Sequence, residues 1–228
     1  MIEQFPKEIE QCFEQGATRL GETLKKLEFP NGGKDAPCNE DNVLINISFY
    51  LSKLTPTFHV YAEANVAQRC RVDMIGCNGK TAFALEAKAF GAINPKSDEA
   101  LRDFNRLQTF RPSLTKRADN EEAYHWWDEA ESRWAIIVIS SFRGRKVSDA
   151  WLAKDENVCR EIMSTYTSPA DRPRKDATGT DTGFLALHKA VLTSYRGVAL
   201  ITDGLHWGAD AGEGWLLWAA NPISRIAV

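Results

Sequence analysis

The sequence lacks the patterns of several common protein classes. Its five cysteines lie far apart and form no Cys-x-x-Cys pair, which excludes a zinc ribbon and a disulfide scaffold. The four histidines lack the spacing of a metal site, and no Gly-x-Ser-x-Gly motif supports a hydrolase triad. Gly79-Lys80-Thr81 resembles the end of a phosphate-binding loop, but Met74 stands where that loop needs a glycine.

Long apolar runs and an excess of one charge are also missing. No stretch of about 18 apolar residues is present to span a membrane. The first residues have neither the basic nor the apolar region of a signal peptide, so a reducing cytoplasm is the expected location. Lys and Arg total 28 against 31 Asp and Glu. A nucleic-acid partner would therefore require locally concentrated positive charge.

The composition, with 43% apolar and 26% charged residues, is typical of a globular protein with a sizeable core. We expect one α/β domain over 1–228, with a mixed central sheet flanked by helices. Periodicity and capping predict helices at 7–28, 40–54 (capped by Asn39), 97–110 (capped by Ser97), 120–131, 148–165 and 183–194. Alternating or apolar runs predict strands at 58–66, 70–75, 81–90, 134–140, 197–202 and, at a sheet edge, 215–219. Residues 171–183 and 203–214 are expected to form loops.

Asn78-Gly79 lies between two extended runs, which is a strong signal for a β-hairpin. If these two residues form the turn, Asp73, Glu86 and Lys88 emerge on one face, because opposed residues and residues two apart share a face. Asp73 and Glu86 then become diagonal neighbours, roughly 7–8 Å apart at Cα. Both carboxylates can reach one cation at that separation. The opposite face carries Phe83, Leu85 and Ala87, which can be buried.

This set of side chains suits phosphodiester hydrolysis. Mg²⁺ prefers oxygen ligands, lowers the pKa of bound water and stabilises developing charge. A lysine beside the carboxylates can orient the attacking water or stabilise the transition state. The alternative is a solvated sheet face with charges at chance spacing. Against it, Glu86 and Lys88 lie in a run, 81–90, that is otherwise apolar or small except for Thr81.

The spacing Asp73-x(12)-Glu86-Ala87-Lys88 spans a hairpin and follows a helix that begins with an acidic residue. In this it resembles the PD-(D/E)XK, restriction-endonuclease-like nuclease superfamily, although Val72 replaces the proline of the family's name. The resemblance covers residues 38–110 and leaves 1–37 as an N-terminal helical extension. It implies that Asp73 and Glu86 bind Mg²⁺ or Mn²⁺ and that Lys88 assists the water.

Three further residues are candidates for this site. Glu40 shares a helix face with Leu44, Ile47 and Leu51, so it is expected to lean inward as a third metal ligand; the alternative is that it only favours the helix dipole. Glu63, on the preceding strand, is a rival third acid. Gln108 resembles a glutamine or basic residue that some family members use, or else is a solvated helix position.

Three basic clusters are candidates for contacts with a phosphate backbone, the alternative for each being a solvated surface. They are Arg111 with Lys116 and Arg117, Arg143 with Arg145 and Lys146, and Arg172 with Arg174 and Lys175. The sequence thus predicts a Mg²⁺-dependent nuclease, an endonuclease acting on DNA rather than RNA, in restriction, defence or repair. The alternative is a catalytically inactive nucleic-acid-binding or protein-interaction module with the same fold. A homodimer or a partner subunit stays open.

Overall fold

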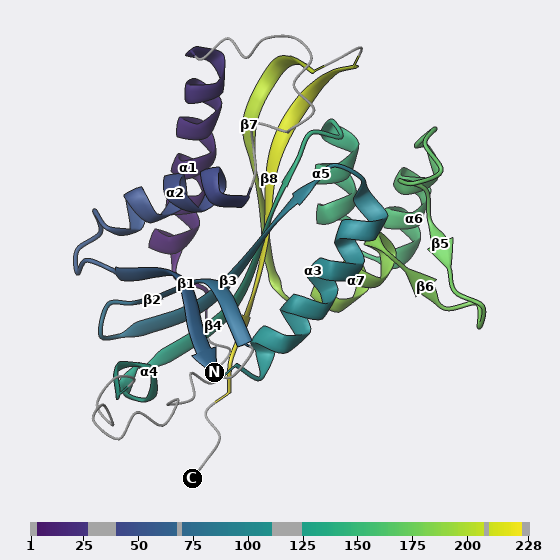
Figure 1. Cartoon of the computed structure of the whole chain (residues 1–228). Coiled ribbons are helices and arrows are strands. Elements are labelled where there is room, and N and C mark those ends of the chain that lie inside the picture. The colour runs from purple at the N-terminus through teal and green to yellow at the C-terminus, as the bar shows by residue number, and fades with distance from the viewer. Residues whose placement is uncertain (1–3, 27–39, 68–69, 111–124, 208–209, 225–228) are drawn as a thin grey trace.

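The computed structural model describes residues 4–26, 40–67, 70–110, 125–207 and 210–224. Within these ranges the chain forms a six-stranded mixed sheet, a separate pair of two-residue strands and seven helices (Figure 1), which confirms the predicted α/β class. The helices are α1 (Lys7–Lys26), α2 (Glu40–Leu51), α3 (Ile93–Gln108), α4 (His125–Glu129), α5 (Arg145–Leu152), α6 (Glu156–Ser164) and α7 (Phe184–Val191). The strands are β1 (His59–Ala67), β2 (Cys70–Cys77), β3 (Thr81–Phe90), β4 (Ser132–Ser141), β5 (Arg174–Lys175), β6 (Asp181–Thr182), β7 (Tyr195–Trp207) and β8 (Asp210–Pro222). No described helix is both long and apolar enough to cross a membrane.

The large sheet has the strand order β1-β2-β3-β4-β8-β7. β3 and β4 run parallel, and the other neighbouring pairs are antiparallel. The parallel pair needs a crossover connection, which contains α3 and α4. β4 is central and buried along nearly its whole length, which explains its almost continuously apolar sequence.

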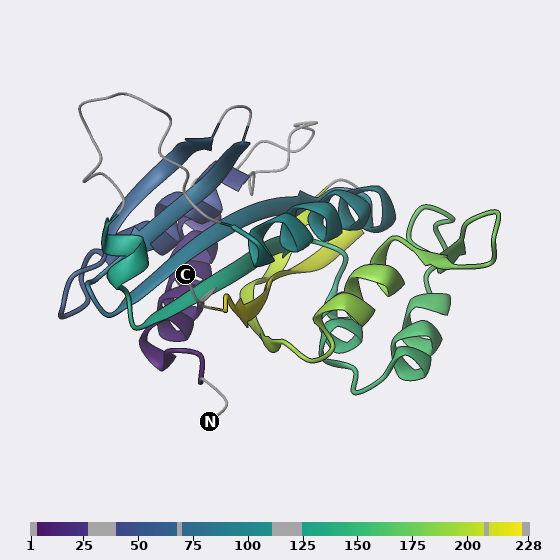
Figure 2. The same ribbon diagram turned by 90° about the horizontal axis from the view of Figure 1, so that it is seen from below.

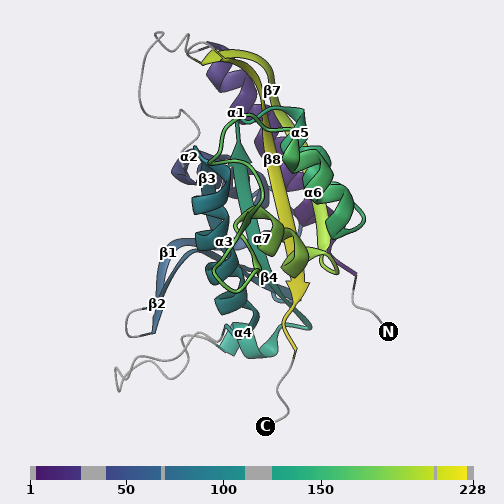
Figure 3. The ribbon, with the colours of Figure 1, turned by 90° about the vertical axis from the view of Figure 1, so that its right-hand side faces the viewer.

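Helices cover both faces of this sheet. α1 and α2 lie on one face, while α3, α5, α6 and α7 lie on the other (Figures 1 and 2). On β3 the two faces separate by parity, as predicted: Phe83, Leu85 and Ala87 pack against α1 and α2, whereas Ala82 and Ala84 pack toward Leu107 of α3. The even-numbered positions of β3, including Glu86 and Lys88, therefore face the α3 layer. Figure 3 shows α3 and α7 side by side over this face.

α1 is part of the main core. Its apolar stripe includes Ile9, Phe13 and Leu20, which share one buried cluster with α2 and the sheet. α1 also approaches β7 closely, because a Cβ at Gly21 would lie only 1.6 Å from the carbonyl oxygen of Ile201. Only glycine allows this contact between backbones. The predicted division of the chain at residue 37 stays a prediction.

The starts and ends of several predicted helices differ from the structure. α3 begins at Ile93, and Ser97 lies inside it with its hydroxyl donating to the Ile93 carbonyl. The single helix predicted at 148–165 is two helices, because Asp155 caps α6 through the N–H groups of Asn157 and Val158. The predicted loop at 171–183 contains the short strands β5 and β6. The cap at Asn39 and residues 120–124 of a predicted helix lie outside the described residues.

The C-terminal strands differ most from expectation. The glycine-containing segment 203–214 is not a loop, since its described residues extend β7 and β8 into one long antiparallel pair. β8 is not at an edge either, because it lies between β4 and β7. Only its residues from Trp215 onward pair with β4, so the part of the hairpin formed by 202–207 and 210–214 extends past β4 as a two-stranded ribbon (Figure 1).

Candidate active site

The turn between β2 and β3 is centred on Gly79-Lys80. The N–H of Asn78 donates to the Thr81 carbonyl over 3.1 Å, which closes the turn one residue later than predicted. Gly79 has a φ of 84°, a left-handed conformation that glycine adopts without strain. The Asn78 side chain accepts from the N–H groups of Lys80 and Thr81, so it supports the turn from its first position. The predicted Asn78-Gly79 turn was therefore wrong by one residue.

This correction changes the register of the hairpin but not the faces of its strands. β2 pairs with β3 from Cys77–Ala82 to Met74–Leu85, a shift of two residues from the predicted register. Because side chains alternate with a period of two, a shift of two leaves each of them on its predicted face. If the register is continued, Asp73 stands opposite Glu86, where the prediction made them diagonal neighbours.

Glu86 lies on β3 and is almost fully buried, with 3% of its surface exposed. Its carboxylate forms an ion pair with Arg106 of α3 and lies 3.6 Å from the Nζ of Lys88. The pKa of Glu86 is raised to about 8, first by burial and then by the charges of Asp73 and Asp103, against the opposing charge of Lys88. A hydrogen bond with Asp73 also favours the protonated form. The Asp73 and Glu86 carboxyl groups therefore share one environment.

Lys88 lies beside this pair of carboxylates. Its Nζ is 2.9 Å from Asp103 of α3, and 11% of its side chain is exposed. Burial alone would lower the pKa of Lys88, but the hydrogen bond and charge of Asp103, together with Glu86 and Asp73, raise it above its ordinary value. Lys88 is therefore held in its charged form with its ammonium group directed at the carboxylates.

Asp73 and Glu40 accept hydrogen bonds from backbone N–H groups of β3, beyond the point where β2 stops pairing with it. The ladder between the strands stops at Met74–Leu85. Beyond it, the N–H of Ala87 donates to Asp73 over 2.8 Å, and the N–H of Ala89 donates to Glu40 over 3.3 Å. Amides two residues apart on a strand are about 7 Å apart. The structure thus brings Glu40 to the same strand edge as Asp73, from the helix layer on the opposite face.

Sequence reasoning missed Asp103 and Arg106. Both lie on α3, three residues apart, and flank the buried stripe that contains Ala100, Phe104 and Leu107. Their helical spacing was readable as a charged border to an apolar face. The position of α3 over β3 cannot be predicted from the sequence. It is this position that brings Asp103 to Lys88 and Arg106 to Glu86.

The remaining acidic and amide candidates have less defined places. Glu63 lies in β1 between the register pairs Ala62–Met74 and Ala64–Val72, so its backbone stands opposite that of Asp73. Gln108 is the half-buried last residue of α3. Two helix positions correspond to about 200° of rotation, so Gln108 leaves α3 on nearly the opposite side from Arg106. The proposed roles of Glu63 and Gln108 stay predictions.

Two of the basic clusters meet in space. Tyr166 lies at their junction: its hydroxyl donates to the carbonyl of Arg143, its own carbonyl accepts from the side chain of Arg172, and the Nζ of Lys146 lies 5.6 Å from its ring. Arg143 also donates to the carbonyl of Gly91, just after β3. Some of the charge is neutralised within the protein, since acidic partners lie near Arg143 (Asp171), Arg145 (Asp149) and Arg174 (Asp98). Lys175 lies in β5 and is exposed, whereas Arg111, Lys116 and Arg117 lie outside the described residues.

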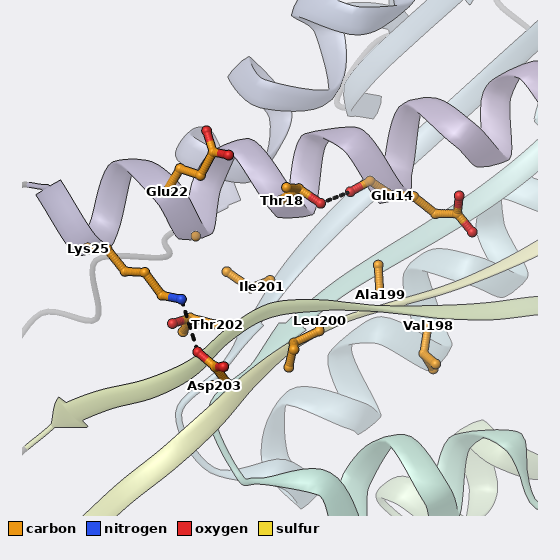
Figure 4. Close-up of a pocket in the computed structure, with 11 residues that line it drawn as sticks. Glu14, Thr18, Glu22, Lys25, Val198, Ala199, Leu200, Ile201, Thr202 and Asp203 are labelled. Atoms are coloured by element: carbon orange, nitrogen blue, oxygen red, sulfur yellow. Dashed lines mark hydrogen bonds and ion pairs between the residues drawn. The ribbon is translucent and has the colours of Figure 1, made fainter.

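A separate hollow of about 550 Å³ lies between α1 and β7 (Figure 4). Its lining mixes aliphatic residues of β7 with polar residues of α1, and Lys25 bridges the two elements through a 3.0 Å ion pair with Asp203. Both of these side chains are largely exposed, so the pair contributes little stability. β7 is separated from β3 by β8 and β4, and the hollow is therefore distinct from the carboxylate site.

The donor set around Glu86 fits a hard divalent cation in part. Asp73 and Glu86 offer two neighbouring carboxylates whose mutual repulsion such a cation would relieve. In the described part of the chain, no group of three or more His, Cys, Asp or Glu side chains is placed to bind a metal ion. Glu40 in particular is held on the Ala89 amide. Asp73 and Glu86 as ligands, and Glu40 as a third, stay predictions.

Comparison with known proteins gives no match to a family model, to a curated sequence or to a solved structure.

Proposed function

We propose that this chain is a metal-dependent nuclease of the PD-(D/E)XK kind, which hydrolyses phosphodiester bonds in nucleic acid, with DNA as the favoured substrate. One observation carries the proposal. The half-buried Asp73 and the buried Glu86, from adjacent strands, interact directly, and the Lys88 ammonium lies 3.6 Å from Glu86. Buried charges are costly unless they are paired or bind a metal, and clusters of them with a perturbed pKa are frequent at functional sites. The helix-flanked mixed sheet is consistent with a restriction-endonuclease-like fold.

Each of the three residues has a distinct role in this proposal. Asp73 and Glu86 would hold Mg²⁺ or Mn²⁺, with Glu40 completing the set if its carboxylate leaves the Ala89 amide. Such an ion supplies an activated water and neutralises charge on the phosphate. Lys88 directs its ammonium group toward the water or toward the developing negative charge. The Asp73–Ala87 hydrogen bond fixes the orientation of the Asp73 carboxylate against β3.

The basic residues around Tyr166 support a nucleic-acid substrate. Arg143 contacts Gly91, three residues beyond Lys88, which corresponds to about 10 Å along an extended strand. A phosphate backbone bound at Lys88 would therefore pass close to Arg143, Lys146 and Arg172. Contacts to phosphates orient a nucleic acid without reading its sequence. These residues would accordingly contribute affinity rather than specificity.

A second function is favoured by a different observation. Glu86 is already paired with two cations, Arg106 and Lys88, and such ion-pair networks also occur in proteins without catalytic activity. The alternative is a nucleic-acid-binding or interaction module that keeps the fold and its charges. In that case Lys88 would be structural or one phosphate contact among several.

One cleavage experiment separates these functions. Wild type, Asp73→Ala and Lys88→Met are incubated with plasmid, single-stranded DNA and RNA in Mg²⁺ or Mn²⁺, and Glu99→Ala serves as a control for an exposed carboxylate on α3. We expect Asp73→Ala to lose cleavage and Mn²⁺ binding. Lys88→Met should lose about 10²–10³ in rate while keeping most metal and nucleic-acid affinity. Cleavage by Lys88→Met at the wild-type rate would refute its catalytic role.

The binding module makes opposite predictions for the same proteins. Wild type would then cleave none of the substrates with either metal. Lys88→Met would weaken nucleic-acid binding modestly and reduce its salt dependence by about one unit of slope.

A further inference from the structure

Arg106 connects the three elements that build the candidate active site. Its guanidinium pairs with Glu86 of β3, donates to the carbonyl of Arg71 in β2 over 2.9 Å, and lies 3.3 Å from Asp103 on its own helix. Arg71 is two residues from Asp73. The positive charge of Arg106 is thus held beside the two carboxylates that the proposed function assigns to a divalent cation.

The charges of the site show that Glu86 needs a positive partner whenever its carboxyl group is ionised. Asp73, Glu86 and Asp103 supply three carboxyl groups, and Lys88 and Arg106 supply two cations. Glu86 is almost fully buried, so leaving its carboxylate without a counter-ion would be costly. Lys88 is shared between Glu86 and Asp103 and lies closer to Asp103. Arg106 is therefore the main counter-ion of Glu86.

The side chain of Arg106 is more exposed than that of Lys88, so it can move away from Glu86 more easily. About a third of its side chain is exposed (35%), against 11% for Lys88. A guanidinium does not lose its proton at accessible pH, so its charge can leave the site only by moving. If Glu86 held a divalent cation, the positive charge of Arg106 would be repelled at short range. The guanidinium group of Arg106 can turn toward solvent while the aliphatic part of the side chain stays against the surface of its own helix.

We propose that Arg106 is a displaceable counter-ion: it holds Glu86 while no divalent cation is bound, and it leaves Glu86 when the cation enters. This inference rests on the proposed function, because it assumes that Asp73 and Glu86 bind the metal. Arg106 and the metal then compete for one carboxylate. The metal affinity of the protein is set in part by α3, which carries none of the metal ligands.

The test measures Mn²⁺ binding alone, by calorimetry on the full chain without nucleic acid. Arg106→Gln removes the competing charge, and we expect it to bind Mn²⁺ about tenfold more tightly than wild type, within the usual range for coupled sites. Arg106→Lys keeps a charge on a shorter side chain and should fall between the two. Arg102→Gln, at an exposed position one turn earlier on α3, should match wild type. Asp73→Ala, combined with Arg106→Gln, should abolish binding.

A second measurement follows Arg106 directly. In protein labelled with ¹⁵N-arginine, titration with Mg²⁺ should shift the side-chain Nε signal of Arg106 and increase its exchange with water, while that of Arg102 stays unchanged. This readout does not depend on whether the Arg106→Gln variant folds normally.

The outcomes separate the displacement from the proposed function. If Asp73-dependent Mn²⁺ binding occurs but Arg106→Gln binds no more tightly than wild type, the displacement is refuted and the metal site stands. If the Arg106 signal does not change at saturating Mg²⁺, the displacement is refuted as well. If neither wild type nor Arg106→Gln binds Mn²⁺, the proposed metal site fails and the displacement fails with it.

Discussion

At the scale of single residues, buried charges in this protein are held by partners that lie far away in the sequence. Glu86 is paired by Arg106, and Lys88 by Asp103, both from a helix that begins after β3 has ended. Asp73 and Glu40 reach the same strand edge from β2 and α2. Each of these side chains is fixed by another element, so moving any one element would change the chemistry of the site.

The facing of Asp73, Glu86 and Lys88 was predictable from the sequence because a strand has a period of two. That prediction survived an error in the turn, since the register shifted by an even number of residues. The partners on α3 were not predictable in the same way. A helix period says which side chains share a face, but not where the helix lies over the sheet. Arg106 was therefore missed, and Gln108 was chosen instead.

His188 provides a test of burial at the residue scale. It is fully buried in α7, and its Nε2 lies 3.1 Å from both the Ala153 carbonyl and the Nη1 of Arg196. Burial lowers the pKa of His188 below its ordinary value, and the charge of Arg196 adds to this, against the Ala153 carbonyl and the charges of Glu156 and Asp155. The folded state thus prefers the neutral ring.

The direction of this shift predicts how stability depends on pH. Below about pH 6.5 the unfolded chain takes up a proton that folded His188 resists, so stability falls as the pH drops and is fully present above pH 6.5. We expect the free energy of unfolding to lose up to about 1.4 kcal/mol per pH unit from this residue as the pH falls below about 6.5. Urea unfolding of wild type and His188→Gln measures it, and the variant should show a flatter profile. Parallel profiles would contradict the assignment.

At the scale of elements, α3 depends on a cap that the local sequence does not supply. Ala92 precedes the helix and offers no side-chain hydrogen bond. Instead, the buried carboxylate of Asp171 accepts from the N–H of Ile93 over 2.9 Å, while Asn94 in turn accepts from Phe184 at the start of α7. The predicted start at Ser97 was wrong for this reason, because a cap 78 residues away leaves no trace beside the helix.

Removing this cap should destabilise the protein measurably. In Asp171→Ala the N–H of Ile93 loses its acceptor, and Arg143 loses an acid 3.7 Å away. We expect a loss of about 1–3 kcal/mol in the free energy of unfolding, because a buried donor is left unsatisfied. Asp171→Asn keeps an acceptor and should lose less. Asp149→Ala, whose exposed acid pairs with Arg145 one helical turn away, is the matched control and should change stability by less than about 0.5 kcal/mol. Equal unfolding midpoints for Asp171→Ala and Asp149→Ala would contradict the capping role.

Helix and strand types were predictable where the apolar pattern was continuous, as in α1, β3 and β4. Helix and strand types were harder to predict where a polar residue or a glycine interrupted the apolar pattern. Asp155 is a good capping residue, yet the apolar positions on either side of it continue a helical pattern, which concealed the break between α5 and α6. In β7 and β8 the glycines indicated a loop, although tertiary pairing holds these residues in strands.

At the scale of the whole molecule, the N-terminal helix is a structural part of the core. Phe13 is fully buried, and its ring packs edge-on against Trp218 of β8, with centroids 5.6 Å apart. This contact joins the first helix to the last strand. The first helix therefore belongs to the same buried apolar cluster as α2 and the sheet.

Truncating Phe13 tests this integration. Phe13→Ala should lower the free energy of unfolding by about 3–5 kcal/mol, the usual cost of a cavity left by a buried phenylalanine. Gln11→Ala changes an exposed position on the same helix and should stay within about 0.5 kcal/mol of wild type. Chemical denaturation followed by circular dichroism compares the two. If Phe13→Ala unfolds at the same denaturant concentration as Gln11→Ala, α1 is only a loosely attached extension.

The position of β8 between β4 and β7 has a consequence for synthesis on the ribosome. β4, with the apolar run Trp134–Ile139, is made about 75 residues before the segment that pairs with it, Trp215–Pro222. Until that last segment emerges, one edge of β4 has no β8 to pair with, and an apolar strand with an open edge is prone to aggregation. A nascent chain stalled before β8 would therefore depend on chaperones at this strand, although the finished protein keeps β4 buried.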